Sequence, residues 1–342
     1  MGATIKKYLD ILLASIVAFT AFNFYYLWVA AFQMDYLRAV VTFTEDRPYV
    51  YRVLVPFLAR LLSTLSGIDA ISCLMFVVVC SAIGLYFSFK YFYTTFYDPR
   101  HAPIISFIGC ELYFLLIAIV AHVYDIATGA FFCLSLAFMA RRKLKAYYLL
   151  FPLATLNRET TFLLILFFVI YFLGRIPFVR YGVAVAYQGI VYLLIKIATE
   201  LAFIGHRGQS FIWWPDFVFR EYGKDLVRTS YYVIIFSLFV GLVLYDWKKK
   251  PPFLRSAFLV LGPSVLVLHF LIGYPYEVRV FAEAFPAGYL LAAAIIFHKS
   301  LTTAQPVVMG PAIPVETAQN SPREFSIGKQ SHGASTDPAS TA

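Results

Sequence analysis

Long apolar runs, interrupted only by short polar stretches, constrain this chain more than any other feature. Of its 342 residues, 61% are hydrophobic and 14% are charged. A helix needs about 20 mainly apolar residues to cross the hydrocarbon core of a bilayer. The pattern therefore predicts an all-α, polytopic helical membrane protein. No polar stretch is long enough for a soluble catalytic domain, so we expect any chemistry to take place in or beside the membrane.

We expect about ten transmembrane segments, all within one helical domain that covers residues 1–299. The expected segments are residues 8–32, 70–92, 103–121, 126–140, 147–153, 162–173, 181–204, 231–244, 257–272 and 281–297. From residue 300 the composition shifts to Pro, Ala, Ser, Thr and Gln, which leaves too little apolar surface to form a core. Residues 300–342 are therefore predicted to be a disordered cytoplasmic tail.

The basic residues predict the orientation of the chain. The net charge is +9, but Lys and Arg are concentrated in short runs beside apolar segments, such as residues 141–145 and 248–250. The positive-inside rule places such runs in the cytoplasm. We expect a multi-pass protein of the cytoplasmic (inner) membrane, in contact with membrane lipids, with both termini cytoplasmic and no nucleic acid partner. The other polar clusters then share the opposite side, so the active face is predicted to be extracytoplasmic.

A segment after the first predicted span carries charges that a spanning helix tolerates poorly. Residues 52–66 are apolar but contain Arg52, Pro56 and Arg60. Because arginine is costly inside a bilayer, we expect an amphipathic helix that lies in the membrane interface. Arg52, at its start, is a candidate for holding a phosphate group through its planar set of donors. The alternative is that Arg52 extends to lipid headgroups.

The polar stretch Asn157, Arg158 and Glu159 separates two strongly apolar segments. A single helix over residues 147–173 would be about 40 Å long, against a hydrocarbon core of about 30 Å. It would also place the basic run at 248–250 outside the cell. We therefore predict two short spans that meet at Asn157–Glu159, below the outer surface. Arg158 could then neutralise a lipid phosphate while Glu159 orients it; the alternative is a structural ion pair.

Two acidic residues, Asp35 and Asp46, lie in the loop after the first predicted span. A carboxylate at the edge of a membrane cavity can act as a general base, because partial desolvation raises its pKa toward the working pH. Asp35 lies closer to the span and is the preferred base, with Asp46 as the second catalytic candidate. The alternative is that both are solvated loop residues.

His122 and Asp125 lie where the third predicted span meets the fourth. We interpret both as substrate-binding candidates, and the alternative for His122 is a structural role at the interface. The pair is also compatible with a divalent metal, although the signal is weak. No cofactor is predicted with certainty, because the chain has neither a Gly-rich phosphate loop nor an H-E-x-x-H motif.

The turn before the last predicted span carries further polar residues. Tyr276 and Glu277 would face an incoming substrate, and Arg279 could bind a phosphate. Arg279 and Glu283 are also spaced i,i+4, so a structural bridge between them is the alternative.

These features resemble the GT-C superfamily of polytopic glycosyltransferases, which use polyprenyl-phosphate-linked sugars. The resemblance rests on the acidic first outer loop (Asp35, Asp46), the interfacial helix after it and the arginine-bearing late turn. Residues 51–56, 156–161 and 277–286 are also similar to recurring stretches in uncharacterised bacterial membrane proteins of this type. The resemblance covers roughly residues 1–299.

The resemblance implies transfer of a sugar, on the extracytoplasmic face, from a polyprenyl-phosphate-linked donor to a lipid, glycan or protein acceptor. Two other functions remain open at this point. A surface-polysaccharide polymerase or ligase would use similar lipid-linked substrates, and a transporter or flippase would carry them across the membrane.

Overall fold

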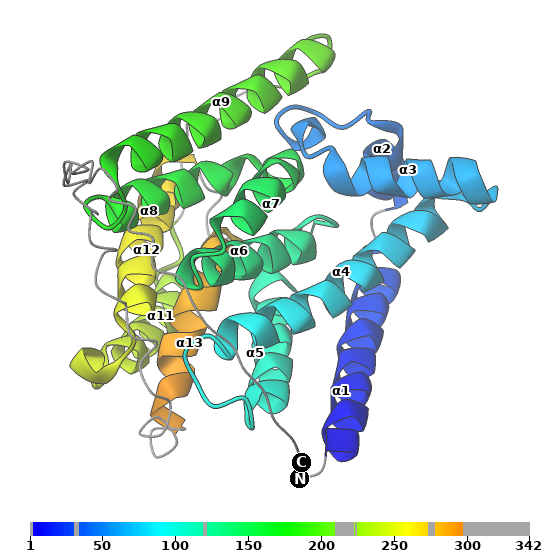
Figure 1. Cartoon of the computed structure of the whole chain (residues 1–342). Helices are drawn as coiled ribbons and strands as arrows, with labels where there is room; N and C mark the ends of the chain where they lie inside the picture. The colour runs from blue at the N-terminus through cyan, green and yellow to red at the C-terminus, as the bar shows by residue number, and fades with distance from the viewer. Residues whose placement is uncertain are drawn as a thin grey trace, which may run out of the picture. The chain divides into compact units, whose positions relative to one another are not determined.

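The computed structural model describes residues 3–30, 34–118, 122–208, 222, 224–272 and 278–296, and within these ranges the chain is helical (Figure 1). No β-strand occurs in these ranges, where the chain forms helices, turns, irregular connections and one isolated bridge between Arg47 and Gly208. The all-α prediction is therefore confirmed for the part of the chain that is described. Residues 300–342, the predicted tail, lie outside it.

The helices follow the apolar runs. In chain order they are α1 (Ala3–Asn23), η1 (Phe24–Ala30), α2 (Met34–Thr42), η2 (Tyr49–Tyr51), α3 (Leu54–Ser66), α4 (Ala70–Tyr93), α5 (Ala102–Ile117), α6 (Asp125–Ala140), α7 (Leu144–Asn157), η4 (Glu159–Thr161), α8 (Phe162–Phe172), α9 (Phe178–Ala202), α11 (Leu226–Leu244), η5 (Trp247–Lys249), α12 (Pro252–Ile272), η6 (Val278–Glu283) and α13 (Phe285–Ile296). Of the elements labelled η, η1 is a π-helix and the others are 3₁₀ helices.

Within the described ranges, four helices are long and apolar enough to cross a membrane: Ile5–Leu27, Ala70–Tyr93, Phe178–Ala202 and Pro252–Leu271. Shorter apolar helices accompany them, including Ala102–Ile117, Asp125–Ala140 and Phe285–Ile295. Many large apolar side chains point outward, and on α9 Phe178 is 82% exposed. Such a surface is stable when lipid covers it. These features are those of a helical membrane protein, and the figure of about ten spans stays a prediction.

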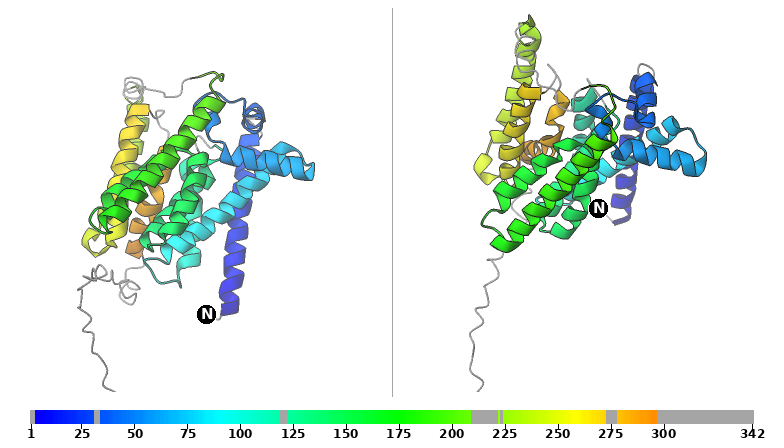
Figure 2. Two further views of the ribbon diagram at one scale, coloured as in Figure 1. Left: turned by 45° about the horizontal axis from the view of Figure 1, so that its top comes forward. Right: turned by 90° about the horizontal axis from the view of Figure 1, so that it is seen from above.

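The helix predicted to lie in the interface forms as α3. Its Pro56 lies in the first turn, where a missing backbone donor does no harm. It ends at Gly67, whose φ of 71° suits glycine at a helix C-terminus. In Figure 2, α3 runs across the direction of α1, as a helix lying in the plane of the membrane would run relative to a spanning one.

The predicted break between two short apolar helices is confirmed. Arg158 takes an extended conformation (φ −160°, ψ 135°) between α7 and η4, so residues 147–173 do not form one helix. The Asn157 side-chain amide (Nδ2) donates to the Tyr124 backbone carbonyl (3.2 Å) and to Thr128 Oγ1 (2.9 Å). These buried bonds to α6 and the turn before it fix the end of α7.

The loop between α2 and α3 folds against the chain that follows α9. The Arg47 amide donates to the Arg207 carbonyl (2.8 Å), and Arg47 Nη2 donates to the Gly208 carbonyl (2.8 Å). His206 Nε2 lies 2.7 Å from the Phe43 carbonyl. A Cβ at Gly208, whose φ is 88°, would lie 2.5 Å from the Arg47 carbonyl oxygen, so this close approach requires glycine. The loop is thereby anchored at both ends.

The core forms where α4 packs against α6, with α1, α3 and α5 around them. Its interior is rich in fully buried aromatic and aliphatic side chains, such as Leu85, Phe89 and Phe132. This packing sets the start of α6 at a fixed place, which matters for the site described next.

Candidate functional site

Six charged side chains from four separate segments meet in one place. They are Arg52, before α3; Asp125, at the start of α6; Arg158 and Glu159, at the break between α7 and α8; and Arg279 and Glu283, in η6. We call these residues the ion-pair network. The three positive and three negative charges balance, which is the condition for keeping ions in apolar surroundings.

The centre of the network is almost closed to solvent. Arg158 Nη1 donates to Asp125 Oδ1 (3.0 Å), and Arg158 Nε lies 3.3 Å from Glu283 Oε1. Arg279 Nη1 donates to the other oxygen of Asp125 (3.3 Å). Asp125 is 0% exposed, and Arg158, Arg279 and Glu283 are each at most 4% exposed. This centre therefore holds the segments together rather than meeting a substrate in the structure as it stands.

The edge of the network is more open. Arg52 Nη2 donates to Glu159 Oε1 (3.2 Å), and the two side chains are 7% and 27% exposed. Burial opposes the charge of Arg52, but the adjacent Glu159 carboxylate more than offsets this, so the pKa of Arg52 is raised. The guanidinium also donates to the Tyr124 hydroxyl. Its carbon lies 4.5 Å from the Tyr124 ring centre and 5.2 Å from that of Tyr49.

Groups other than the arginines also hold Asp125 in place. The His122 amide donates to Asp125 Oδ2 (2.9 Å), and the Tyr113 hydroxyl donates to the Asp125 carbonyl (2.8 Å). The Tyr113 ring occupies the space where a side chain at Gly129 would be, since a Cβ there would lie 2.6 Å from the ring. Glycine at position 129, one turn along α6, thus leaves room for the Tyr113 ring that holds the backbone of Asp125.

The His122 imidazole lies among three tyrosines, which we call the His122 cage: Tyr36, Tyr49 and Tyr124. Its ring centre is 5.2 Å from those of Tyr49 and Tyr124 and 5.3 Å from that of Tyr36. The Tyr36 hydroxyl lies 2.7 Å from Nδ1. The His122 carbonyl accepts a hydrogen bond from Tyr25 (2.7 Å). Both the ring and the backbone of His122 are therefore held in place.

Glu45 is the acid of the first loop that lies beside this site, and our sequence reasoning did not select it. It is half-buried. Burial raises its pKa to about 7, against the opposing effect of Arg52, and Asp46 adds to the rise. Burial, followed by the charge of Glu45, also raises the pKa of Tyr36. No pattern in the sequence separates Glu45 from Asp46; only the fold of the loop does.

The structure does not bring the predicted bases into the network. The Asp35 side chain is fully exposed and pairs with Arg38 (3.6 Å), three residues along α2. Asp46 is exposed, and its carbonyl accepts from the amides of Tyr49 (3.0 Å) and Val50 (3.4 Å), which turns the loop. Both residues point to solvent because the apolar face of α2 and the anchored loop direct them there. A catalytic role for either stays a prediction.

The other predicted residues have mixed outcomes. Arg52, His122, Asp125, Asn157, Arg158, Glu159 and Arg279 are brought together as described above. The partners expected for Arg279 and Glu283 differ from those observed, because Arg279 forms an ion pair with Asp125 and Glu283 forms one with Arg158. Lys196 and Glu200, spaced i,i+4 on α9, form an ion pair at 3.5 Å. Tyr276 and Glu277 lie outside the described residues.

The donor set does not favour a metal ion. Within the described ranges no group of three or more His, Cys, Asp or Glu side chains is arranged to hold one. Both oxygens of Asp125 already accept hydrogen bonds, from Arg158, Arg279 and the His122 amide. The arrangement fits the binding of an anion beside Arg52 better than the binding of a cation.

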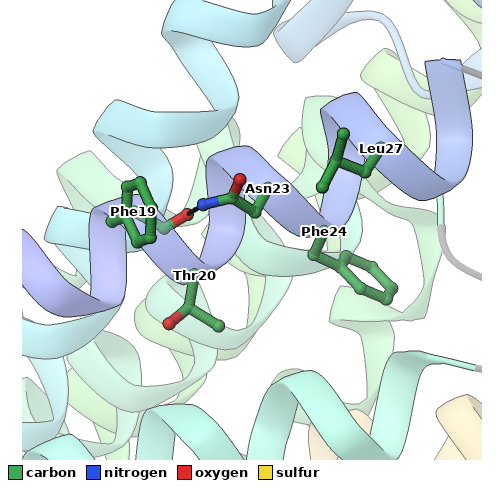
Figure 3. Close-up of a pocket in the computed structure, with 5 residues that line it drawn as sticks. All are labelled: Phe19, Thr20, Asn23, Phe24 and Leu27. Carbon is green, nitrogen blue, oxygen red and sulfur yellow. Dashed lines mark hydrogen bonds between the residues drawn. The ribbon is translucent and has the colours of Figure 1, made fainter.

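An open hollow of about 520 Å³ lies on the surface of α1 and η1 (Figure 3). It is lined by Phe19, Thr20, Asn23, Phe24 and Leu27, and no residue of the ion-pair network is among them. The Asn23 side-chain amide donates to the Phe19 carbonyl (2.8 Å), a bond within its own helix. The hollow and the network are therefore separate features.

In comparisons with known proteins, no family model matches the chain, and no curated protein or solved structure matches it either. Function has to be argued from the site alone.

Proposed function

We propose that this protein is a membrane glycosyltransferase that transfers a sugar from a polyprenyl-phosphate donor to a lipid, glycan or protein acceptor on the extracytoplasmic face. The observation that carries the proposal is the convergence of three arginines from distant segments among apolar helices, with Arg52 paired to the partly exposed Glu159. Polar residues at membrane depth are rare and mark substrate sites more often than they mark structural positions.

Arg52 is the best candidate for contacting the donor phosphate. Its guanidinium carries five N–H donors and lies against Glu159, a carboxylate that is 27% exposed. Carboxylates and phosphates accept the same paired hydrogen bonds from arginine. Glu159 thus occupies the position that a phosphate would take, and its exposure leaves it room to turn away.

The chemistry then needs no free-diffusing cofactor. As the acceptor oxygen bonds to the anomeric carbon of the sugar, the bond between that carbon and the phosphate oxygen breaks, and negative charge develops on the leaving phosphate. A fixed guanidinium that faces this oxygen stabilises the charge in the transition state. Arg158 and Arg279 support the arrangement by holding Asp125, and with it the start of α6, in place.

The lengths of α6 and α7 support an extracytoplasmic site below the membrane surface. The basic turn at residues 141–143 joins the two helices, whereas the network lies at their opposite ends. The positive-inside rule assigns the basic turn to the cytoplasm. Helices of 16 and 14 residues extend only about 24 and 21 Å, less than the ~30 Å hydrocarbon core. A network at their far ends would face outward from within a recess.

Transport of a lipid-linked substrate is the second candidate, and one observation favours it. Glu111 lies within the apolar helix α5, where it is hydrogen-bonded to Thr20, and among the described residues its Oε1 is buried without a partner. Carboxylates inside membrane domains occur along transport paths. A surface-polysaccharide polymerase or ligase would use the same phosphate contacts as the main proposal and differs from it only in the acceptor.

The test is to incubate the purified full-length protein with a panel of polyprenyl-phosphate sugars and to measure release of polyprenyl phosphate. We expect one donor to be consumed. Arg52→Lys should weaken donor binding roughly tenfold to 100-fold, because it removes charge-assisted hydrogen bonds worth about 1.5–3 kcal/mol. Arg38→Lys is the matched control, since Arg38 is exposed on α2. Transport into vesicles without donor consumption would favour the second candidate, and consumption of no donor would contradict the proposal.

A further inference from the structure

The His122 imidazole is oriented more tightly than a purely structural histidine needs to be. Tyr49 and Tyr124 stack on it with interplanar angles of 24° and 7°, while Tyr36 contacts its edge and bonds to Nδ1. Nε2, by contrast, has no hydrogen-bond partner among the described residues, and it is not one of their enclosed polar atoms without partners. One ring nitrogen is therefore held and the other is open.

His122 also lies close to the group that we assign to the phosphate. The imidazole and the Arg52 guanidinium both contact the rings of Tyr49 and Tyr124. The two groups are therefore neighbours that share the same two tyrosine rings. A hydroxyl next to a phosphate-linked sugar held by Arg52 would lie in the vicinity of the imidazole.

The surroundings favour the tautomer in which Nε2 can accept a proton. If Nδ1–H donates to the Tyr36 oxygen, Nε2 carries a lone pair, and the Tyr36 hydroxyl hydrogen is free to point toward an acceptor. Burial, and after it the charge of the half-buried Glu45, raises the pKa of Tyr36. Tyr36 itself orients the His122 ring through Nδ1.

We propose that His122 is the proton acceptor of this site, with Tyr36 as its positioning residue. The inference rests on the proposed function. The acceptor O–H bond breaks and its proton moves to His122 Nε2, while the acceptor oxygen forms the new bond to the anomeric carbon. The bond from that carbon to the phosphate oxygen breaks, and its electron pair stays with the phosphate beside Arg52. The imidazolium later releases the proton to water.

Among the described residues, the charged and titratable groups around His122 come from five segments. They are Tyr25 in η1, Tyr36 on α2, Glu45 in the following loop, Tyr49 and Arg52 at and after η2, and Tyr124 and Asp125 at the start of α6. Arg52 disfavours the imidazolium, whereas Glu45 and Asp125 favour it. Because an imidazolium cannot accept a proton, the transfer rate should fall as the pH is lowered through the titration of His122.

The experiment compares the wild-type protein with His122→Gln and with the matched control His101→Gln, in the turn before α5. Transfer rate and donor binding are measured for each. We expect His122→Gln to lower the transfer rate by about 100-fold or more, the usual contribution of a general base, while donor affinity stays within about twofold. Its residual rate should lose the decline at low pH. Free imidazole should partly restore the rate of His122→Ala, which a structural role would not allow.

A chemical measurement does not depend on turnover. Diethyl pyrocarbonate modifies neutral imidazole nitrogens, and we expect it to label His122 in the wild-type protein, with protection when the donor and acceptor are present. Tyr36→Phe should lower kcat with little change in the donor KM. Absence of labelling, or equal transfer by His122→Gln and the wild-type protein, would overturn the inference while leaving the proposed function intact. Absence of transfer by the wild-type protein with every donor would instead remove the proposed function, and this inference with it.

Discussion

Arg158 donates through Nη1 to Asp125 over 3.0 Å, and these two buried side chains connect the end of α7 to the start of α6. Glu283 contacts Arg158 from a third segment, and Arg279 contacts Asp125. In apolar surroundings a charge that loses its partner cannot be compensated by water. The pair therefore fixes the break between α7 and α8 against the start of α6. Arg52 and His122 lie around this contact.

Arg158→Met should destabilise the protein strongly. The substitution leaves Asp125 and Glu283 buried with one positive charge fewer, and breaking a buried pair from one side costs about 3–5 kcal/mol. Thermal unfolding in a fixed detergent would report the loss. Arg38→Met removes an exposed ion pair and should change stability by less than about 1 kcal/mol. Similar effects of the two substitutions would show that the network is solvated.

Glu159→Gln should strengthen the binding of polyprenyl phosphate by roughly twofold to fivefold, because the carboxylate no longer competes for Arg52. A direct binding measurement of polyprenyl phosphate to the purified protein would report the change. Asp98→Asn, which removes a carboxylate that pairs with Arg100 in the turn before α5, should leave binding unaltered. Weaker binding by Glu159→Gln would indicate that Glu159 itself contacts the substrate.

Glu45 should make stability decrease as the pH rises. Its pKa is raised to about 7 in the folded protein from 4.5, so between these values the folded state binds more protons than the unfolded state. This contribution is fully present below pH 4.5 and is lost as the pH rises through 7. The difference in unfolding temperature between the wild-type protein and Glu45→Gln, followed from pH 4 to 8, isolates it. A difference that does not vary with pH would contradict the buried position of Glu45.

Gly129→Ala should destabilise the start of α6 by about 1–3 kcal/mol, the usual effect of overpacking. The new Cβ would lie 2.6 Å from the Tyr113 ring, so the ring has to move and its bond to the Asp125 carbonyl is weakened. Gly182→Ala on α9 is the control, since a Cβ there has nothing within 4 Å. Its stability should be unchanged or slightly increased. Equal effects at both positions would contradict the tight contact.

Cysteine labelling should test the side on which the site opens. Glu159→Cys, at the partly exposed edge of the network, should react with a membrane-impermeant maleimide added from the extracytoplasmic side. Lys145→Cys, exposed at the first turn of α7, should react only from the cytoplasmic side. The parent protein provides the background from its own cysteines. Labelling of both positions from one side would remove the proposed topology.

Much of the architecture follows from composition and apolar patterning. A bilayer requires each spanning segment to satisfy its own backbone hydrogen bonds, so long apolar runs in such a chain form helices. One helix over residues 147–173 would exceed the hydrocarbon core, so the charged stretch at Asn157–Glu159 predicts an interruption, which the extended Arg158 confirms. The pairing of Lys196 with Glu200 also follows directly, because the two residues are one helical turn apart.

The sequence by itself determined that this protein is helical, that its apolar runs suit a membrane, and that polar residues interrupt those runs at the positions of Arg52, His122, Asp125, Arg158 and Arg279. Only the tertiary structure decided which of these charges pair with one another. It also excluded Asp35 from the network and placed Glu45 beside it. The local sequence determines where helices form and which residues are i,i+4 neighbours. The partners of a buried charge are instead residues more than 30 positions away. They are brought together by helix packing and by the anchoring of the loop at Arg47 and Gly208.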